Sequence, residues 1–253
     1  NAEYMGGVIM VELGVLRVVI FLLAASFGQS GDHNDVYSPC SDTIVRKSDG
    51  FTLGIAFSSM SSFYLNGNTS GVLYSPCDSR LGLSNAASQL AVFRPKVDEI
   101  SLLTVNASNF SPDSYGGYMV AFAGRKYAAR SKPAFVGNDT FTVTSFTLVV
   151  EFKKGRLQNL YWKRDGCDKC SQGSSNFTCL NNVDCAISAR NCKSRGGPED
   201  CSLGIQLAFS GTDKYYSALN SWYEVSRLRQ YSLYGLYSNL VSSLSSRYNK
   251  IFG

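Results

Sequence analysis

Residues 146–162 read FTLVVEFKKGRLQNLYW, and this stretch decides the fold class. From Phe146 to Phe152 the apolar side chains recur at every second position, which is the pattern of a β-strand with one buried face. A Lys-Lys-Gly turn follows, and the chain then returns through Leu160 and Trp162. The sequence therefore predicts an antiparallel hairpin whose apolar face continues across both strands.

Two loop lengths fit this turn. A three-residue loop at 153–155 sets Leu160 opposite Leu148, which keeps the apolar face continuous, with the glycine in the left-handed conformation. A two-residue loop would instead pair Lys153 with Arg156 and bring Asn159 onto the apolar face. We therefore expect the longer loop.

Other segments alternate apolar residues with small or polar ones and are interpreted as strands, at 51–57, 90–93, 100–105, 118–122 and 203–209. The alternation is strictest in Phe51–Phe57 and in Leu203–Phe209, and a further strand is expected at 219–228. Repeated alternating segments with turn residues between them are typical of all-β folds. The sequence predicts a mainly β protein, an antiparallel sandwich or jelly-roll of roughly eight to ten strands.

The hydrophobic period changes near the end of the chain. Apolar side chains recur there at intervals of three and four residues, at Leu233, Leu236, Leu240, Leu244 and Tyr248. This spacing predicts an amphipathic helix over 231–253, packed on the β domain. The expected organisation is a leader at 1–28, a β domain at 29–230 and this C-terminal helix.

Six of the eight cysteines lie between residues 167 and 201, spaced C-x2-C-x8-C-x5-C-x6-C-x8-C. They are Cys167, Cys170, Cys179, Cys185, Cys192 and Cys201. The residues between them are mostly turn formers, and a segment with so few large apolar side chains needs covalent cross-links to become ordered. The sequence predicts a disulfide-rich insertion at 165–202 with three internal bridges, whose pairing the spacing does not fix.

The other two cysteines each end a Tyr-Ser-Pro-Cys tetrapeptide, and we expect a fourth bridge, Cys40–Cys77. Closing that loop would stabilise the fold by about 4 kcal/mol in the chain-entropy model. The insertion itself lies between Trp162 of one expected core strand and Leu203 of another. If those strands are neighbours, the two ends of the insertion lie close together, and a short linker could replace it in a weakened but folded protein.

The N-terminal residues have the pattern of a signal peptide. Arg17 precedes an apolar run at 18–25, and the small residues Ser26 and Gly28 follow. The run is too short to span a bilayer, and no apolar tail precedes Gly253, so we expect no membrane anchor. Five Asn-x-Ser/Thr sequons agree with secretion into an extracellular space. They are Asn68, Asn106, Asn109, Asn138 and Asn176.

Several kinds of catalytic site are excluded by composition. His33 is the one histidine, so the chain cannot form a multi-histidine metal site, and no Ser-His-Asp triad or Cys-His pair is expected within the β domain. Cys167 and Cys170 have the spacing of a redox motif, but serines and glycine follow them instead of a helix start, so we interpret them as structural. We expect no metal and no cofactor.

The formal net charge is +5, and the basic residues are dispersed along the sequence. The absence of a basic run argues against a nucleic-acid partner. A mild positive charge is compatible with association with acidic polysaccharide or with an anionic membrane surface.

Three functional hypotheses remain. The first is a non-catalytic extracellular module that binds polysaccharide or a surface protein, since amphipathic aromatic rings can stack on sugars. Its candidate binding residues are Tyr215, Tyr216, Trp222 and Tyr223. The second is a carboxylate-based glycosidase or other wall-modifying enzyme, which needs two acids in one cleft. Its candidate acids are Asp98, Glu99, Glu151, Asp213 and Glu224. The third is a disulfide-rich inhibitor or signalling ligand.

Three stretches resemble a family of secreted plant proteins labelled only as expressed or uncharacterised. They are VYSPCSD at 36–42, DGFTLGIAF at 49–57, and LNSWYEV at 219–225 with LRQY at 228–231. The resemblance implies an apoplast or cell-wall setting. It implies no catalytic residues.

Overall fold

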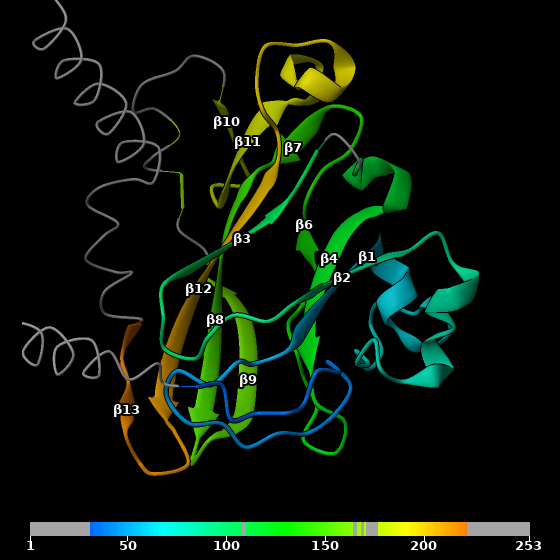
Figure 1. Ribbon diagram of the computed structural model, residues 1–253. Helices are drawn as coiled ribbons and strands as arrows, with labels where there is room; N and C mark the ends of the chain where they lie inside the picture. The colour runs from blue at the N-terminus through cyan, green and yellow to red at the C-terminus, as the bar shows by residue number, and fades with distance from the viewer. Residues whose placement is uncertain (1–30, 108–109, 164–165, 168–169, 171–176, 222–253) are drawn as a thin grey trace, which may run out of the picture. The chain divides into compact units, whose positions relative to one another are not determined.

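The computed structural model describes residues 31–107, 110–163, 166–167, 170 and 177–221 (Figure 1). The chain divides into two compact units, Asn1–Asp32 and His33–Gly253, and the account below concerns the second. Several expectations lie outside the described residues: the leader at 1–28, the helix at 231–253, Asn109, Asn176, Trp222, Tyr223 and Glu224. Among the described residues, none of the helices is long and apolar enough to cross a membrane.

The first sheet has the strand order β2-β1-β4-β5, and β6 also pairs with β4. Its strands are β1 (Leu53–Ser59), β2 (Gln89–Phe93), β4 (Gly117–Ala123), β5 (Ala129–Arg130) and β6 (Ala134–Phe135). Every pair in this sheet is antiparallel. The strand expected at 51–57 is present, and Phe51, Leu53, Ile55 and Phe57 share the main core. It is not half-buried, because its other face is buried as well, with Ala56 in a second apolar cluster.

The second sheet has the order β13-β12-β8-β9, and β3 also pairs with β12. Its strands are β3 (Ser101–Val105), β8 (Ser145–Lys153), β9 (Arg156–Lys163), β12 (Leu203–Thr212) and β13 (Ala218–Leu219). Of the strand expected at 219–228, Leu219 lies in β13, and residues 222–228 lie outside the described part of the chain.

A third, smaller sheet has the order β10-β11-β7. Its strands are β7 (Phe141–Val143), β10 (Phe177–Leu180) and β11 (Asp184–Ser188). Short 3-10 helices occupy the connections. They are η1 (Met60–Phe63), η2 (Leu65–Gly67), η3 (Ser79–Leu81), η4 (Leu83–Asn85), η5 (Pro112–Tyr115), η6 (Ala189–Asn191) and η7 (Lys193–Arg195).

The predicted mainly β fold is confirmed, with two differences. The described residues form thirteen strands, more than expected, because two-residue strands such as β5 and β13 are too short to show alternation. The pair β8–β12 is parallel, whereas an antiparallel fold was expected. The chain leaves β9, passes through the cysteine-rich segment and re-enters the sheet beside the beginning of β8, so β12 must run in the same direction as β8.

The two five-stranded sheets share one apolar core. Side chains of β1 and β8 that are at most 1% exposed meet in it: Leu53, Ile55, Phe57, Leu148 and Val150. Full burial of such a side chain stabilises the fold by about 1.5–3 kcal/mol. Phe51 and Phe152 link the sheets edge to face, with ring centroids 5.1 Å apart.

The hairpin of β8 and β9 has the shorter loop, so the three-residue prediction is wrong. Lys153 pairs with Arg156. Lys154 and Gly155 form the loop with φ of 54° and 71°, as a two-residue type I′ turn requires.

A β-bulge then corrects the register. Leu157 lies opposite Phe152, but Asn159 lies opposite Glu151, so Gln158 is an extra residue in β9. The bulge keeps Asn159 exposed and returns the expected apolar residues to the core face. These are Leu160, opposite Val150, and Trp162, opposite Leu148.

All eight cysteines are paired in the structure. The bridge Cys40–Cys77 is present, and three bridges lie inside the cysteine-rich segment, as the sequence predicts. The internal pairs are Cys167–Cys179, Cys170–Cys185 and Cys192–Cys201.

The cysteine-rich segment is more firmly joined to the domain than expected. Its strand β11 pairs with β7, and Ala186 belongs to the main core. Its ends are not on neighbouring strands, because β8 lies between β9 and β12. The segment therefore bridges two parts of the domain, which is a correction to the simple excursion expected from Trp162 and Leu203.

Candidate functional site

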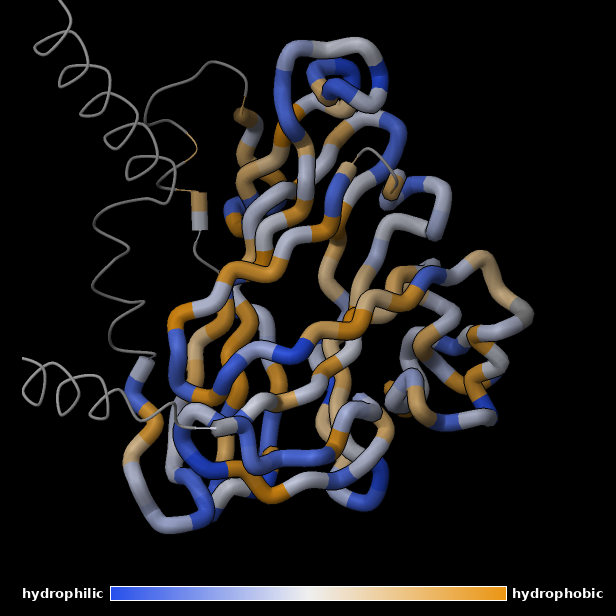
Figure 2. Tube along the Cα trace, in the orientation of Figure 1, coloured by the Kyte–Doolittle hydropathy of each residue, from blue (hydrophilic) through white to orange (hydrophobic). Residues whose placement is uncertain are grey.

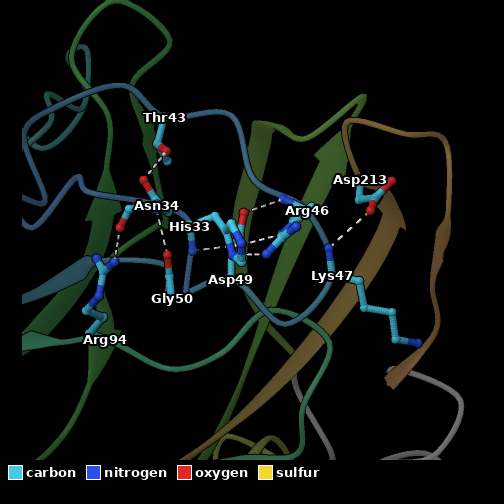
Figure 3. A network of polar contacts seen from close by, with 9 residues as sticks. All are labelled: His33, Asn34, Thr43, Arg46, Lys47, Asp49, Gly50, Arg94 and Asp213. Carbon is cyan, nitrogen blue, oxygen red and sulfur yellow. Dashed lines mark hydrogen bonds and ion pairs between the residues drawn. The ribbon is translucent and has the colours of Figure 1, made fainter. Parts of the chain in front are cut away.

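The N-terminal segment 33–50 is fixed to the domain by buried polar groups (Figure 3). The Asp49 carboxylate, 1% exposed, accepts hydrogen bonds from Arg46 Nε at 2.9 Å and from the backbone N–H of His33 at 3.3 Å. The Asn34 amide donates to the carbonyl of Gly50 at 2.6 Å. A rigid segment therefore crosses the end of the sandwich where the loops described below meet.

Asp213 was a candidate catalytic acid, and the structure gives it a structural role. It is 3% exposed, and its Oδ1 accepts the backbone N–H groups of Tyr215 and Ser217, both at 2.8 Å. Its Oδ2 accepts the backbone N–H of Lys47 at 3.1 Å (Figure 3). With both oxygens occupied inside the fold, the carboxylate orders its own loop and the N-terminal segment.

Asp98 has a similar structural role. Its Oδ1 accepts the backbone N–H groups of Asn220 and Ser221 at 2.8 Å, and its Oδ2 lies 2.7 Å from the Lys47 ammonium. Two other candidate acids are on the surface: Glu99 pairs loosely with Lys96 at 3.6 Å, and Glu151 faces outward on β8. Two hollows on the described surface, one beside Asp42 and one beside Asp113, each have room for little more than a water molecule.

Three loops meet at one end of the sandwich, at the bottom of Figure 1. They are 124–128 between β4 and β5, 153–156 between β8 and β9, and 213–217 between β12 and β13. We call this surface the tyrosine end. It consists of Arg125, Lys126, Tyr127, Lys153, Lys154, Arg156, Lys214, Tyr215 and Tyr216. Figure 2 shows these loops towards the hydrophilic end of the scale, in contrast to the orange strands that they connect.

Backbone hydrogen bonds hold the loops of the tyrosine end together. Val45 donates its N–H to the carbonyl of Gly155 at 2.9 Å and accepts the N–H of Lys214 at 3.0 Å. Gly155 in turn donates to the carbonyl of Thr212 at 2.9 Å. The N-terminal segment thus ties two of the three loops into one fixed surface.

The third loop is held by Asp42. Its carboxylate accepts the backbone N–H groups of Arg125, Lys126 and Tyr127 at 2.8, 2.9 and 3.1 Å. Burial acts to raise the pKa of this carboxyl, but the three hydrogen bonds and the Lys126 charge outweigh it and leave the pKa below its ordinary value of 3.8. Asp42 is therefore an ionised anchor for the loop at neutral pH.

The predicted residues Tyr215 and Tyr216 are 69% and 65% exposed, and Tyr127, which was not predicted, is 46% exposed. A cation lies beside each ring. Lys214 Nζ is 5.1 Å from the centroid of Tyr215, and Lys154 Nζ is 5.2 Å from that of Tyr216. The guanidinium of Arg156 is 5.1 Å from the centroid of Tyr127. Tyr215 and Tyr216 thus expose most of their surface and Tyr127 about half, and each ring has a positive charge close to one face.

The tyrosine end carries six cations. None of them forms an ion pair within the described part of the chain. They are Arg125, Lys126, Lys153, Lys154, Arg156 and Lys214. Sequence reasoning missed this cluster because its residues come from three distant loops, although both Gly-Arg-Lys and Lys-Lys-Gly are turn signals with cations at their tips.

Of the five sequons, three are described, and their asparagines Asn68, Asn106 and Asn138 are all exposed. The amide oxygen of Asn138 accepts the N–H of Thr140 at 2.9 Å, and that of Asn68 accepts the N–H of Ser70 at 3.0 Å.

Comparisons with known proteins give one match. A family model described as Uncharacterised protein DDB_G0273449 matches residues 9–142 and 130–248. No curated protein and no solved structure matches the chain. The match agrees with the expected uncharacterised family but does not support a plant source. Since the matched residues span most of the sequence, the chain belongs to the family of Uncharacterised protein DDB_G0273449.

Proposed function

We propose that this protein is a secreted, disulfide-stabilised, non-catalytic binding module and that the tyrosine end binds a polysaccharide. The observation that carries the proposal is the set of exposed rings of Tyr127, Tyr215 and Tyr216 on loops that internal hydrogen bonds already hold in place. Such rings present a flat apolar face with a polar tip, which suits stacking on a sugar ring. Little further ordering is needed on binding, so little conformational entropy is lost.

An extracellular location for the protein is part of this proposal. Its support is the four disulfides and the exposure of the three described sequon asparagines. Glycans at these asparagines would agree with passage through the secretory route. The resemblance to secreted plant proteins adds an apoplast or cell wall as a setting, and the proposal does not depend on it.

Of the alternatives, the glycosidase has least support from the described acids. Asp98 and Asp213 are occupied by N–H groups and by Lys47, and neither of the two hollows described above is lined by a candidate acid. Glycoside hydrolysis requires two carboxyl groups about 5–10 Å apart on either side of a bound sugar.

A glycan array with the purified full chain tests the proposal. The double variant Tyr215→Ala/Tyr216→Ala is expected to bind its glycan about 5- to 100-fold more weakly, because it loses two stacking faces. Tyr74→Ala is the matched control, since Arg80 lies 4.4 Å from the Tyr74 ring but this pair is outside the tyrosine end.

The outcomes separate the hypotheses. Unchanged binding by the double variant would show that the glycan binds elsewhere on the molecule. Release of reducing sugar by the wild-type protein would favour the glycosidase, and binding of a cell-surface protein without any glycan would favour a protein partner.

A further inference from the structure

We infer that the ligand of the tyrosine end is a polyanionic polysaccharide, a polymer whose sugar rings carry carboxylate or sulfate groups. This inference rests on the proposed function and adds the chemical class of the ligand to it. The rings of the tyrosines account for sugar stacking, but they do not account for the cations around them.

The fold leaves this surface with an excess of positive charge. The six cations of the tyrosine end form no ion pair within 4 Å among the described residues. Asp42 binds three backbone N–H groups, and Asp213 binds three others. Both carboxylates keep their charge, and Lys126 contributes to the lowered pKa of Asp42. Two acids against six cations still leave a formal excess of positive charge at this surface.

The arrangement matches a charged sugar chain in a second respect. Each of the three tyrosines of the tyrosine end has a cation 5.1–5.5 Å from its ring centroid, so every ring has a positive charge close to it. An acidic polysaccharide repeats the same two features, an apolar sugar face and an anionic group. Arg156 presents a planar fork that can bind a carboxylate or sulfate through two hydrogen bonds.

Two other polyanions are less well matched. An anionic membrane is bound most firmly when apolar side chains enter it, and Ile44 at 43% exposure is the aliphatic side chain exposed beside this surface. Single-stranded nucleic acid also binds surfaces of cations and aromatic rings. The disulfides indicate an oxidising compartment, where polysaccharide is the more abundant polyanion. An anionic membrane and a single-stranded nucleic acid are both included in the experiment as competing ligands.

Binding of the purified full chain is measured against pairs of polymers with the same rings and different charge. Polygalacturonate is compared with its methyl ester, and dextran sulfate with dextran, which also separates carboxylate from sulfate recognition. Phosphatidylserine vesicles and an oligothymidylate are the competitor arms. Each titration is repeated as the ionic strength rises from about 0.01 M to 0.15 M, which shortens the Debye length from roughly 30 to 8 Å.

The charge contribution is isolated with matched variants. Lys154→Gln/Lys214→Gln is expected to weaken binding of the acidic polymer by about 3- to 30-fold and to reduce its salt dependence. The control Arg190→Gln/Lys193→Gln removes two exposed cations from the cysteine-rich segment and is expected to leave binding unchanged.

Each outcome has one interpretation. Salt-sensitive binding of an acidic polymer that is weakened in Lys154→Gln/Lys214→Gln and unchanged in Arg190→Gln/Lys193→Gln supports the inference. Equal binding of charged and neutral polymers, lost in Tyr215→Ala/Tyr216→Ala but kept in the lysine variant, overturns the charge assignment and leaves the proposed function standing. Binding of no polysaccharide overturns both. Tighter binding of vesicles or oligothymidylate than of any polysaccharide replaces the ligand class.

Discussion

Gly155 lies where the hairpin turn, the N-terminal segment and the 213–217 loop meet. Its φ is +71°, and a Cβ there would lie 2.3 Å from the carbonyl oxygen of Val45 and 2.8 Å from the nitrogen of Lys214. Only glycine allows so close an approach of backbones in this conformation. The contact of the hairpin turn with the N-terminal segment and the 213–217 loop therefore requires a residue without a side chain at position 155.

The variant Gly155→Ala is expected to destabilise the protein by about 2–4 kcal/mol, since the left-handed conformation costs about 1–2 kcal/mol and the backbone contacts must also open. Gly82→Ala is the control, because Gly82 has φ +60° with nothing within 4 Å of the added methyl. The urea unfolding midpoints of both variants measure how much stability each substitution removes. Equal losses would mean that the close contacts at Gly155 relax without cost.

Asp42 predicts an acid-sensitive tyrosine end. A carboxyl whose pKa is lowered on folding contributes stability that is present above its unfolded pKa and is lost as the pH falls through the lower folded pKa. For Asp42 this loss occurs below its ordinary value of 3.8. We expect Asp42→Asn to have a lower Tm than the wild type at neutral pH, with the gap between the two Tm values narrowing as the pH falls below 3.8. A constant gap in Tm across this range would contradict the role assigned to the carboxylate.

The β8–β9 hairpin shows at the scale of one element what the sequence could and could not predict. The residues that share the core face were predicted correctly from Leu148, Val150, Leu160 and Trp162, because alternation identifies the residues of one face. Burial of the opposite face, at Val149, was not predicted. The loop was predicted wrongly, because a bulge shifts the register by one residue and so allows the shorter turn. The spacing of three between Leu157 and Leu160, in a strand where two is regular, was the available signal.

Deleting Gln158 is expected to be tolerated, at a cost within about 1–2 kcal/mol, because the remaining residues keep every observed partner and the bulge becomes a regular ladder. Deleting Tyr161 is the control. It moves Trp162 from the core face to solvent and is expected to cost several kcal/mol, on the order of a large core truncation. Thermal unfolding of the two deletion variants makes the comparison. Loss of folding in the Gln158 deletion would mean that the bulge itself is required.

At the scale of the whole molecule, sequence reasoning identified the elements but not all of their neighbours. The insertion was expected from Cys167–Cys201 and the strand from Leu203–Phe209, and both exist. Local periodicity does not predict long-range contacts. Two of these are the parallel pairing of β12 with β8 and the meeting of the loops at 124–128, 153–156 and 213–217. From the sequence, only Tyr215 and Tyr216 of the tyrosine end were predicted as binding residues.

The cysteine-rich segment is expected to matter for the stability of the whole domain. Replacing 165–202 with a Gly/Ser linker removes the partner of β7, buried Ala186, and the Arg195–Asp113 ion pair at 2.6 Å. We expect this variant to lose more stability than Cys192→Ala/Cys201→Ala, which removes one bridge at a cost of about 2–4 kcal/mol. Calorimetric unfolding ranks the two. A linker variant as stable as the wild type would show that the segment is a dispensable excursion after all.

The parallel β8–β12 pair also affects the order in which the strands can pair during folding. A chain synthesised from its N-terminus completes the β8–β9 hairpin at once, but β12 emerges only after the whole of 165–202. Until then one edge of β8, a long apolar strand, has no partner and can pair with other chains. We expect amides of β8 to become protected in pulsed hydrogen exchange later than those of β1 and β4, and this interval to be the one in which newly made protein aggregates most readily.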